Sequence, residues 1–421
     1  MAASKTQDEL IDEFVAERNK NRGRVIIPQM KEIPPQMECW YGAIMNEYLT
    51  TDVIRHYCDG IGDWQNPLWH DEDYARNKTR WGGIVAPPTI GDAIVQPYAG
   101  PMLTDEEIKE SPFKSSFTLP NCATRWLYQV FRPGDRFHVI MIDMGLTEIK
   151  PARRPAPARE FDDVMRRLIF NQREELVSVH DRHMEMVVNH ELGDNPFWIA
   201  PGEKGKRKFR KITNEERDAI IQGYENMRIR GEERLYWEDV KVGETVWPLT
   251  VGPLSAYDNM SAYGCIVPGH GACFDSEWQR IKRAFHFHSF NEEINMWECS
   301  GVCHVIPDAG KHAKIFTGGP PVAFYCQMEG LLGRMITNWM GDDGFLAFLD
   351  VRMPIIPIVG EVIGCRGKVI NKRIENGEHL VDLDIHIENQ DKVVLLEGKA
   401  TIRLISRDDY IDVNKIPQRL V

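Results

Sequence analysis

Residues 62–89, GDWQNPLWHDEDYARNKTRWGGIVAPPT, place an aspartate and a histidine on either side of an Asn-Pro turn. Asp63 and His70 are residue types that can hold one water molecule, remove a proton from it and return a proton elsewhere. Each well-placed proton transfer of this kind accelerates a reaction by about 10²–10⁴. Asn66 opens a turn that the next proline stiffens, which would hold the two side chains in place. The pattern indicates acid–base chemistry on water.

The end of the same stretch suits a second task, the stabilisation of negative charge on a carbonyl oxygen. Backbone N–H groups at the start of a helix provide such stabilisation. Gly83 allows a close backbone approach, whereas Pro87 and Pro88 have no N–H to donate. Thr89 is the first residue after the prolines that keeps one. We therefore expect Gly83 or Thr89 to be the donor.

A purely structural interpretation of this stretch is the alternative. Asn-Pro is an ordinary turn, and residues 69–81 read as a helix with acidic residues in the first turn and basic residues in the last. The helix dipole alone favours that arrangement.

Similar signals recur in the same order on both sides of a helical segment, which indicates an internal duplication. Pro87-Pro88 and Pro320-Pro321 each precede an apolar helix pattern, and Gly134 and Gly360 each mark a turn within a long strand region. Strand patterns follow at 124–146, 166–172 and 175–188 in the first half, and at 235–255, 344–370, 379–390 and 393–405 in the second. Between the halves, Thr213 and Glu216 form a capping-box pattern.

The predicted fold class is α+β. One long apolar helix followed by several strands, twice over, favours two antiparallel sheets that each wrap around a central helix and join as one continuous sheet. We divide the chain into an N-terminal helical extension (1–36), an N-terminal domain with the catalytic motif (37–201), a helical linker (202–236) and a C-terminal domain (237–421) with an insertion at about 265–317.

The phrases YCDGIGDWQNPLWHDEDYA and TRWGGIVAPPT resemble the hydratase motif of the MaoC-like acyl-CoA dehydratases and (R)-specific enoyl-CoA hydratases, and YWEDVKVGE, NWMGDDGFL and GEHLVDLDIHIENQ extend the similarity to the double-hot-dog members. The resemblance implies a double hot-dog fold, a homodimer and reversible addition of water to a 2-enoyl thioester of coenzyme A. It also implies that Asp63 and His70 are catalytic and that Asn66 fixes their loop. The spacing from Asp63 to His70 is wider than is usual in the family.

The second half contains Asp258 and Asn259 but no Asn-Pro-Leu and no matching histidine, so we expect one active site, in the N-terminal half. The insertion is rich in aromatic residues, and we expect Phe287 and Trp297 to shape a pocket for a bulky acyl group. The alternative is that these aromatic residues only pack the insertion onto the sheet.

Basic residues in two places are candidates for binding the phosphates of coenzyme A. Lys206, Arg207 and Arg210 lie in the basic run GEKGKRKFRK, and Arg80 adjoins the motif beside Trp81, which we also expect to contact the substrate. A solvated linker is the alternative for the basic run.

Histidines and cysteines also gather in the insertion, but only Cys299 and Cys303 have the spacing of zinc ligands. We therefore expect no metal, and the resemblance implies no redox cofactor.

Composition narrows the classes of partner, location and function that remain for this protein. The formal net charge of −12 argues against nucleic acid as a partner. No apolar run is long enough to span a membrane, and the first residues lack a secretory signal pattern. Nine scattered cysteines favour reduced thiols and a cytoplasmic protein. The expected activity is that of an acyl-CoA hydratase or dehydratase; the alternatives are a 3-hydroxyacyl-CoA C–C lyase, a thioesterase or a non-catalytic acyl-thioester-binding protein.

Overall fold

The computed structural model describes residues 5–26, 46–95, 116–152, 158–188, 210–266, 289–292, 295–298, 323 and 325–408. The helices in these ranges are α1 (Gln7–Arg18), α2 (Thr51–Ile61), α3 (Glu72–Lys78), α4 (Gly91–Ile94), α6 (Asn214–Glu225), α7 (Ala256–Ile266) and α10 (Tyr325–Met340), with 3-10 turns η1 (Asn19–Asn21), η3 (Pro67–Trp69) and η6 (Trp237–Asp239). The strands are β1 (Val25–Ile26), β2 (Ser116–Leu127), β3 (His138–Glu148), β4 (Arg159–Phe170), β5 (Leu176–Val188), β6 (Thr245–Val251), β7 (Ser289–Asn291), β8 (Met296–Glu298), β9 (Phe345–Arg352), β10 (Ile363–Glu375), β11 (Glu378–Glu388) and β12 (Val394–Arg403).

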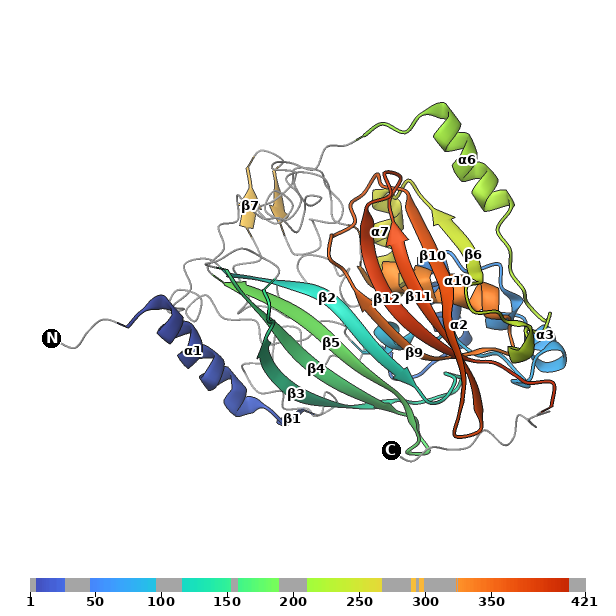
Figure 1. Ribbon diagram of the computed structural model, residues 1–421, viewed down its shortest axis with the longest axis horizontal. Coiled ribbons are helices and arrows are strands. Elements are labelled where there is room, and N and C mark those ends of the chain that lie inside the picture. The colour runs from blue at the N-terminus through green and yellow to red at the C-terminus, as the bar shows by residue number, and fades with distance from the viewer. Residues whose placement is uncertain are drawn as a thin grey trace.

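One antiparallel sheet runs through both halves of the chain (Figure 1). Its ten strands follow the order β1-β3-β4-β5-β2-β9-β12-β11-β10-β6, and β7 and β8 form a separate pair. Read outward from the seam between β2 and β9, the two halves have the same strand order. The strand regions predicted from the sequence are confirmed. The domain boundaries stay predictions.

The predicted correspondence between the turns at Gly134 and Gly360 is confirmed by their hydrogen bonds. The N–H of Gly134 donates to the carbonyl of Leu49 over 2.8 Å, and the N–H of Gly360 donates to that of Leu254 over 2.7 Å. The N–H of the same leucine donates to the carbonyl of the residue after the glycine, over 2.9 Å in each half. Both glycines have positive φ, 88° and 94°, which glycine adopts most easily. The same loop is therefore built twice.

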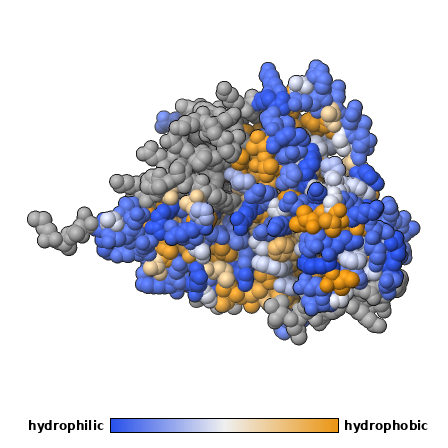
Figure 2. Space-filling view, in the orientation of Figure 1, coloured by the Kyte–Doolittle hydropathy of each residue, from blue (hydrophilic) through white to orange (hydrophobic). Residues whose placement is uncertain are grey.

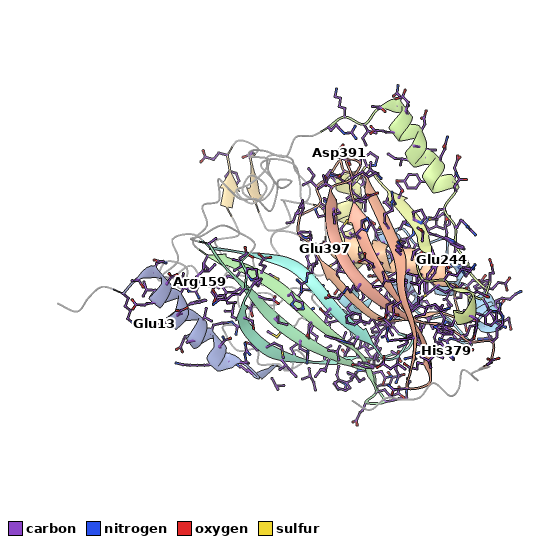
Figure 3. The ribbon with its side chains drawn as sticks, in the orientation of Figure 1. Glu13, Arg159, Glu244, His379, Asp391 and Glu397 are labelled. Carbon is purple, nitrogen blue, oxygen red and sulfur yellow. The ribbon has the colours of Figure 1, made fainter. Side chains whose placement is uncertain are left out.

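Each half also begins with a helix of 12 residues that is opened by a Thr-x-x-Glu capping box, at Thr6 for α1 and, as predicted, at Thr213 for α6. The first helix is tied firmly to the sheet. Arg18 at its end lies 2.6 Å from Asp143, and Arg159 of β4 pairs with an aspartate of α1 over 2.8 Å (Figure 3).

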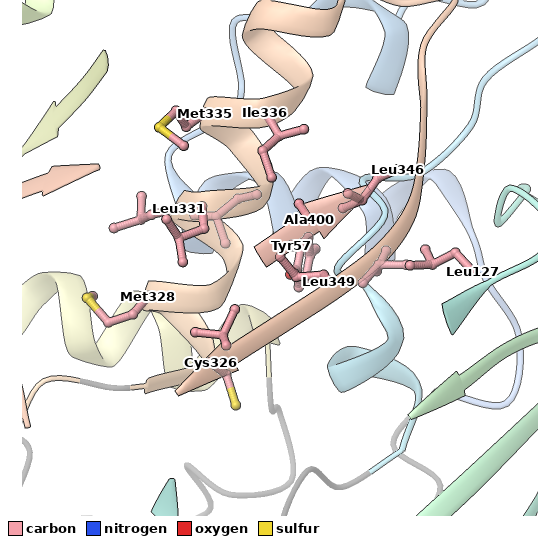
Figure 4. Packing of buried hydrophobic residues seen from close by; sticks show 14 of the residues in the cluster. Tyr57, Leu127, Cys326, Met328, Leu331, Met335, Ile336, Leu346, Leu349 and Ala400 are labelled. Atoms are coloured by element: carbon pink, nitrogen blue, oxygen red, sulfur yellow. The ribbon is translucent and has the colours of Figure 1, made fainter. Parts of the chain in front are cut away.

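The main core surrounds α10, whose residues are all buried. Figure 4 shows Met328, Leu331 and Met335 of this helix among side chains of the sheet and of α2. Full burial of each such apolar side chain contributes about 1.5–3 kcal/mol. Gly330 lets α10 approach α2, since a Cβ there would lie 2.3 Å from Ile61 Cγ2. This packing fixes the segment that follows α2.

A buried network of charges joins α4 to α10. Arg125 of β2 lies 2.6 Å from Asp92 of α4 and also pairs with Glu329 of α10. Arg182 of β5 lies 3.2 Å from Asp92 and 2.9 Å from Glu329. All four side chains are almost fully buried. Because an unpaired buried charge is costly, these contacts hold the helices of the two halves together.

Hydrophilic residues cover α1 and α6 in the view of Figure 2, and the apolar residues there form separate patches. Within the described ranges, no helix has both the length and the apolar character needed to cross a membrane.

Candidate active site

Asp63 directly follows α2, and the end of that helix fixes its backbone. Gly62 ends α2 in the left-handed conformation, with φ 69°. The N–H of Asp63 then donates to the carbonyl of Cys58 over 2.7 Å, as in a Schellman motif. A Cβ at position 62 would lie 2.9 Å from the guanidinium of Arg334. The left-handed turn therefore favours glycine here, and the small residue also leaves room for the Arg334 side chain.

The carboxyl group of Asp63 is buried with few partners. Its Oδ2 accepts a hydrogen bond from the indole N–H of Trp69 over 2.8 Å, and Arg334 Nε lies 3.6 Å from its Oδ1. Oδ1 accepts no hydrogen bond from the residues that the structure describes. Burial raises the pKa of Asp63 to about 6, because the loss of water outweighs the opposing effects of Arg334 and Trp69. Such a group can exchange protons near neutral pH.

His70 is near Asp63 in the sequence, but its side chain points elsewhere. The turn η3 carries Trp69 inward, where its indole is buried, and ends at His70, which is exposed. Nε2 of His70 lies 2.8 Å from the carbonyl oxygen of Trp64. The structure therefore brings Asp63 together with Trp69 and leaves His70 at the surface.

The helix that the structural interpretation predicted for this stretch is present as α3. Asp71 caps it by accepting the N–H of Tyr74 over 2.9 Å, and its first turn is acidic and its last turn basic. A helix and a catalytic loop are compatible, because the helix starts only after His70.

Asn66 connects the motif loop to the C-terminal half. Its Oδ1 accepts the N–H of Leu68 over 3.1 Å, which caps η3, and its side chain also bonds to the carboxyl group of Asp342. The hydroxyl of Tyr74 donates to Oδ2 of Asp342 over 2.6 Å. Burial is the main cause that raises the pKa of Asp342 to about 6. Asp342 was not predicted from the sequence, although it belongs to a Gly-Asp-Asp-Gly turn that follows an apolar helix pattern.

A small pocket of about 30 Å³ opens between the halves beside these groups. Its lining includes Asn66, Trp69 and Trp81 from the N-terminal half and Thr337, Asp342 and Phe345 from the C-terminal half. The indole N–H of Trp81 donates to the backbone carbonyl of Asp342 over 2.6 Å. A mainly apolar pocket with a few convergent polar groups is typical of a ligand site.

The predicted charge-stabilising donors lie near this pocket. Pro88 is part of the lining, and Thr89 is buried behind it. The hydroxyl of Tyr57 donates to Thr89 Oγ1 over 2.9 Å. Among the described residues, no backbone carbonyl accepts a hydrogen bond from the N–H of Thr89. Gly83 lies in the partly buried loop before the prolines. Both donor roles stay predictions.

Arg80 is close to the pocket, and its guanidinium lies 4.3 Å from the ring centre of Trp81. Its N–H donates to the carboxyl group of Asp343 over 2.8 Å. Burial lowers the pKa of Arg80 to about 10, so the side chain remains charged at neutral pH. A partly buried cation beside an aromatic pocket wall suits an anionic group of a ligand.

Arg210 has protein partners instead. Both oxygens of Glu216 accept its guanidinium, over 2.8 and 2.9 Å, and Asp391 lies 2.9 Å from its Nε. Asp391 belongs to the turn between β11 and β12, near α6 (Figure 3). Lys206 and Arg207 lie outside the described residues.

The predicted acyl-binding insertion is described only at 289–292 and 295–298. Trp297 is opposite Phe290 in the β7–β8 pair, whereas Phe287 lies outside the described residues. Cys299 and Cys303 also lie outside them. The aromatic pocket and the absence of a metal stay predictions.

Asp258 is not the counterpart of Asp63. It lies in the first turn of α7, where its Oδ2 accepts the N–H and the hydroxyl of Ser255 over 2.6 Å each. Since Leu254 corresponds to Leu49, the position of Asp258 matches Val53 in α2, and Asp63 corresponds to a position beyond the end of α7.

The symmetric sheet with helices packed against it defines a double hot-dog protein, as the sequence predicted. A solved structure described as a MaoC-like dehydratase is similar to this chain, with a TM-score of 0.56 and 16% identity over 92% of this chain and 99% of that chain. A MaoC-like dehydratase from Phytophthora capsici gives a TM-score of 0.47 and 9% identity over 89% and 99% of the two chains. A conserved hypothetical protein from Mycobacterium tuberculosis with a double hot-dog fold gives a TM-score of 0.46 and 11% identity over 91% of this chain and 96% of that chain.

The first of these comparisons confirms the α+β double hot-dog fold and its resemblance to a MaoC-like protein. No protein-family model matches the sequence, and the comparison with curated proteins finds no match.

Proposed function

We propose that this protein adds water reversibly to a 2-enoyl-CoA thioester to give a 3-hydroxyacyl-CoA thioester. The observation that carries the proposal is a pair of buried carboxyl groups: Asp342 lines the apolar pocket, and Asp63 is bonded to Trp69 of the same lining. Burial raises the pKa of each to about 6. The likeness in fold to a MaoC-like dehydratase supports the same reaction class.

In the proposed reaction, Asp63 acts as the base that takes a proton from water while the water oxygen bonds to C3. The electrons of the C2–C3 double bond move toward the thioester oxygen, and an N–H donor such as that of Thr89 or Gly83 stabilises the charge there. Protonation of C2 then completes the addition. The addition of water forms a C–O bond and a C–H bond with no net change of oxidation state, so it requires no redox cofactor, and the proposed steps assign no role to a metal.

The proposal extends to the substrate and the assembly. A bulky acyl group would enter from the side of the insertion, toward Phe287 and Trp297, and Arg80 would pair with a phosphate of coenzyme A. We also propose a cytoplasmic homodimer, because the resemblance to double-hot-dog dehydratases implies a dimer and the cysteine pattern favours a reducing compartment.

The test is hydration of short, long and aromatic 2-enoyl-CoA thioesters, followed by loss of the conjugated enoyl absorbance. Wild-type protein should hydrate at least one class, and Asp63→Asn should lower the rate by about 100-fold or more. Asp59→Asn is the matched control, because Asp59 is an exposed aspartate on α2. It should change the rate by less than about threefold.

Other outcomes would redirect the proposal. Release of free thiol from the thioester would favour a thioesterase, and release of an aldehyde or ketone would favour a C–C lyase. Binding of the thioesters without any turnover would favour an acyl-thioester-binding protein. Full activity in Asp63→Asn would move the site away from this pocket.

A further inference from the structure

One of the residues that line the pocket, Asp342, has a carboxyl group and does not belong to the motif. Asp342 lies just beyond α10, in the C-terminal half, and lines the pocket together with Asn66. His70, the histidine of the motif, is exposed and bonds to its own loop at Trp64. We propose that Asp342 is a second acid–base residue of this site and carries the proton transfer that the motif assigns to His70. The inference rests on the proposed hydratase function.

Asp342 is held in place from several directions. The hydroxyl of Tyr74 and the side chain of Asn66 both bond to its carboxyl group. Its backbone accepts the indole of Trp81 over 2.6 Å and donates to the carbonyl of Gly231 over 2.9 Å. A carboxyl group fixed by neighbours in this way keeps its orientation toward a bound ligand, which acid–base catalysis requires.

The surrounding charges give the two carboxyl groups different roles. Asp63 faces the cation of Arg334, which favours its ionised form. Asp342 faces Asp343 and Glu232, and both disfavour its ionised form. The hydrogen bond from Tyr74 acts in the opposite direction and favours the ionised form of Asp342. We assign the role of base to Asp63 because Arg334 lies beside it, and the role of proton donor to Asp342 because it lines the pocket.

The proton balance of the proposed step is complete. Ionised Asp63 accepts one proton of water as the remaining hydroxyl bonds to C3. The electron pair of the former double bond passes through the thioester enolate to C2, where it takes the proton of Asp342. The site then holds protonated Asp63 and ionised Asp342, and exchange of one proton between them through solvent restores the starting state.

The experiment compares Asp342→Asn with His70→Ala and with Asp384→Asn as the matched control. Asp384 is an exposed aspartate on β11, in the same half of the chain, and it does not line the pocket. Turnover of the best 2-enoyl-CoA substrate would be measured from pH 5 to pH 9, with thermal unfolding of each variant as the check on folding.

We expect Asp342→Asn to lower kcat by about 100-fold or more, and Asp384→Asn to lower it by less than about threefold. His70→Ala should lose far less than Asp342→Asn. In the wild-type protein, kcat should fall as the pH rises and Asp342 loses its proton; in Asp342→Asn, this alkaline decrease should be absent. A purely structural role would not remove it.

Three results would overturn the inference. In the first, His70→Ala loses about 100-fold while Asp342→Asn stays active. In the second, Asp342→Asn loses activity only together with thermal stability and keeps the alkaline decrease, which would make Asp342 only a contact between the halves. In the third, wild-type protein hydrates no thioester, in which case the proposed function fails and the inference fails with it; the first two leave the hydratase function intact.

Discussion

The two halves share a sheet layout and a repeated loop, yet they contribute different parts to the pocket. The N-terminal half contributes the loop after α2, which contains Asp63 and Asn66. The C-terminal half contributes α10 and the turn beyond it, which bring Arg334 and Asp342 to that loop. In the C-terminal half, Asp258 lies at the start of α7 and only caps that helix. A duplicated fold has thus produced one composite site, with its charged groups taken from both copies.

This difference predicts that the contact between the halves is the most sensitive part of the fold. Glu329→Ala would leave Arg125 and Arg182 without one of their buried carboxylate partners. The free energy of unfolding should fall by about 3–5 kcal/mol, the usual cost of breaking a buried ion pair from one side. Urea unfolding would measure this loss.

Glu397→Ala is the control for that variant, because Glu397 is an exposed glutamate on β12 (Figure 3). It should change the free energy of unfolding by less than about 0.5 kcal/mol. Equal losses in both variants would show that the buried network does not connect the halves.

The second prediction concerns the effect of burying the Asp63 carboxyl group on stability. The pKa of Asp63 is raised from 3.8 to about 6 in the folded protein, so folding is favoured while the group is protonated and disfavoured once it ionises. Asp63→Asn should be as stable as the wild type below pH 4. As the pH rises through 6, the free energy of unfolding of the variant should exceed that of the wild type by a growing amount, at most about 3 kcal/mol.

Urea unfolding at pH 4 and pH 8 would test this difference. Asp258→Asn changes the superficially similar aspartate of the other half, which is a helix cap, so it should show no advantage that grows with pH. An advantage of Asp63→Asn that is the same at both pH values would contradict the burial of an ionisable group.

Much of this arrangement could be predicted from the sequence, and the missing parts have a physical reason. The strands follow apolar patterns and glycine turns, which are local signals, so the double sheet was predictable. The Asp-Asn-Pro pattern also located Asp63 and Asn66. The inward side of η3 was not predictable, because packing decides that Trp69 and not His70 contacts Asp63. Asp342 was missed because it reaches the motif only through the fold.

The third prediction concerns how α10 comes close enough to α2 to reach the motif loop. Gly330→Ala would place a Cβ 2.3 Å from Ile61 Cγ2, so the helices would have to separate. The free energy of unfolding should fall by about 1–3 kcal/mol, as for other overpacked cores. Gly223→Ala in α6 is the control, because its Cβ would make only an ordinary contact at 3.6 Å.

Glycine to alanine should change the free energy of unfolding with opposite signs at the two sites. Where space allows, alanine favours a helix over glycine by up to about 1 kcal/mol. Thermal and urea unfolding of both variants would measure the signs. Stabilisation by Gly330→Ala would mean that the two helices are not in close contact.

The smallest expected effect is a difference in global stability between N-cap variants of α1 and α6, two helices that begin with the same capping box. Thr6→Ala and Thr213→Ala each remove a side-chain acceptor at a helix start, which typically costs about 1 kcal/mol. In α1, Ile11 is fully buried and Arg18 pairs with the sheet, so the helix should unfold together with the domain. Thr6→Ala should therefore lower the free energy of global unfolding by about 1 kcal/mol.

In α6 most residues are exposed, so this helix can open while the sheet stays folded. Thr213→Ala should speed hydrogen exchange at the amides of α6 and change global unfolding by less than about 0.5 kcal/mol. Equal changes in global stability would show that α6 is as firmly attached as α1. The unequal result would mean that the helix before the first half is part of the core, whereas its copy before the second half serves mainly as a connection.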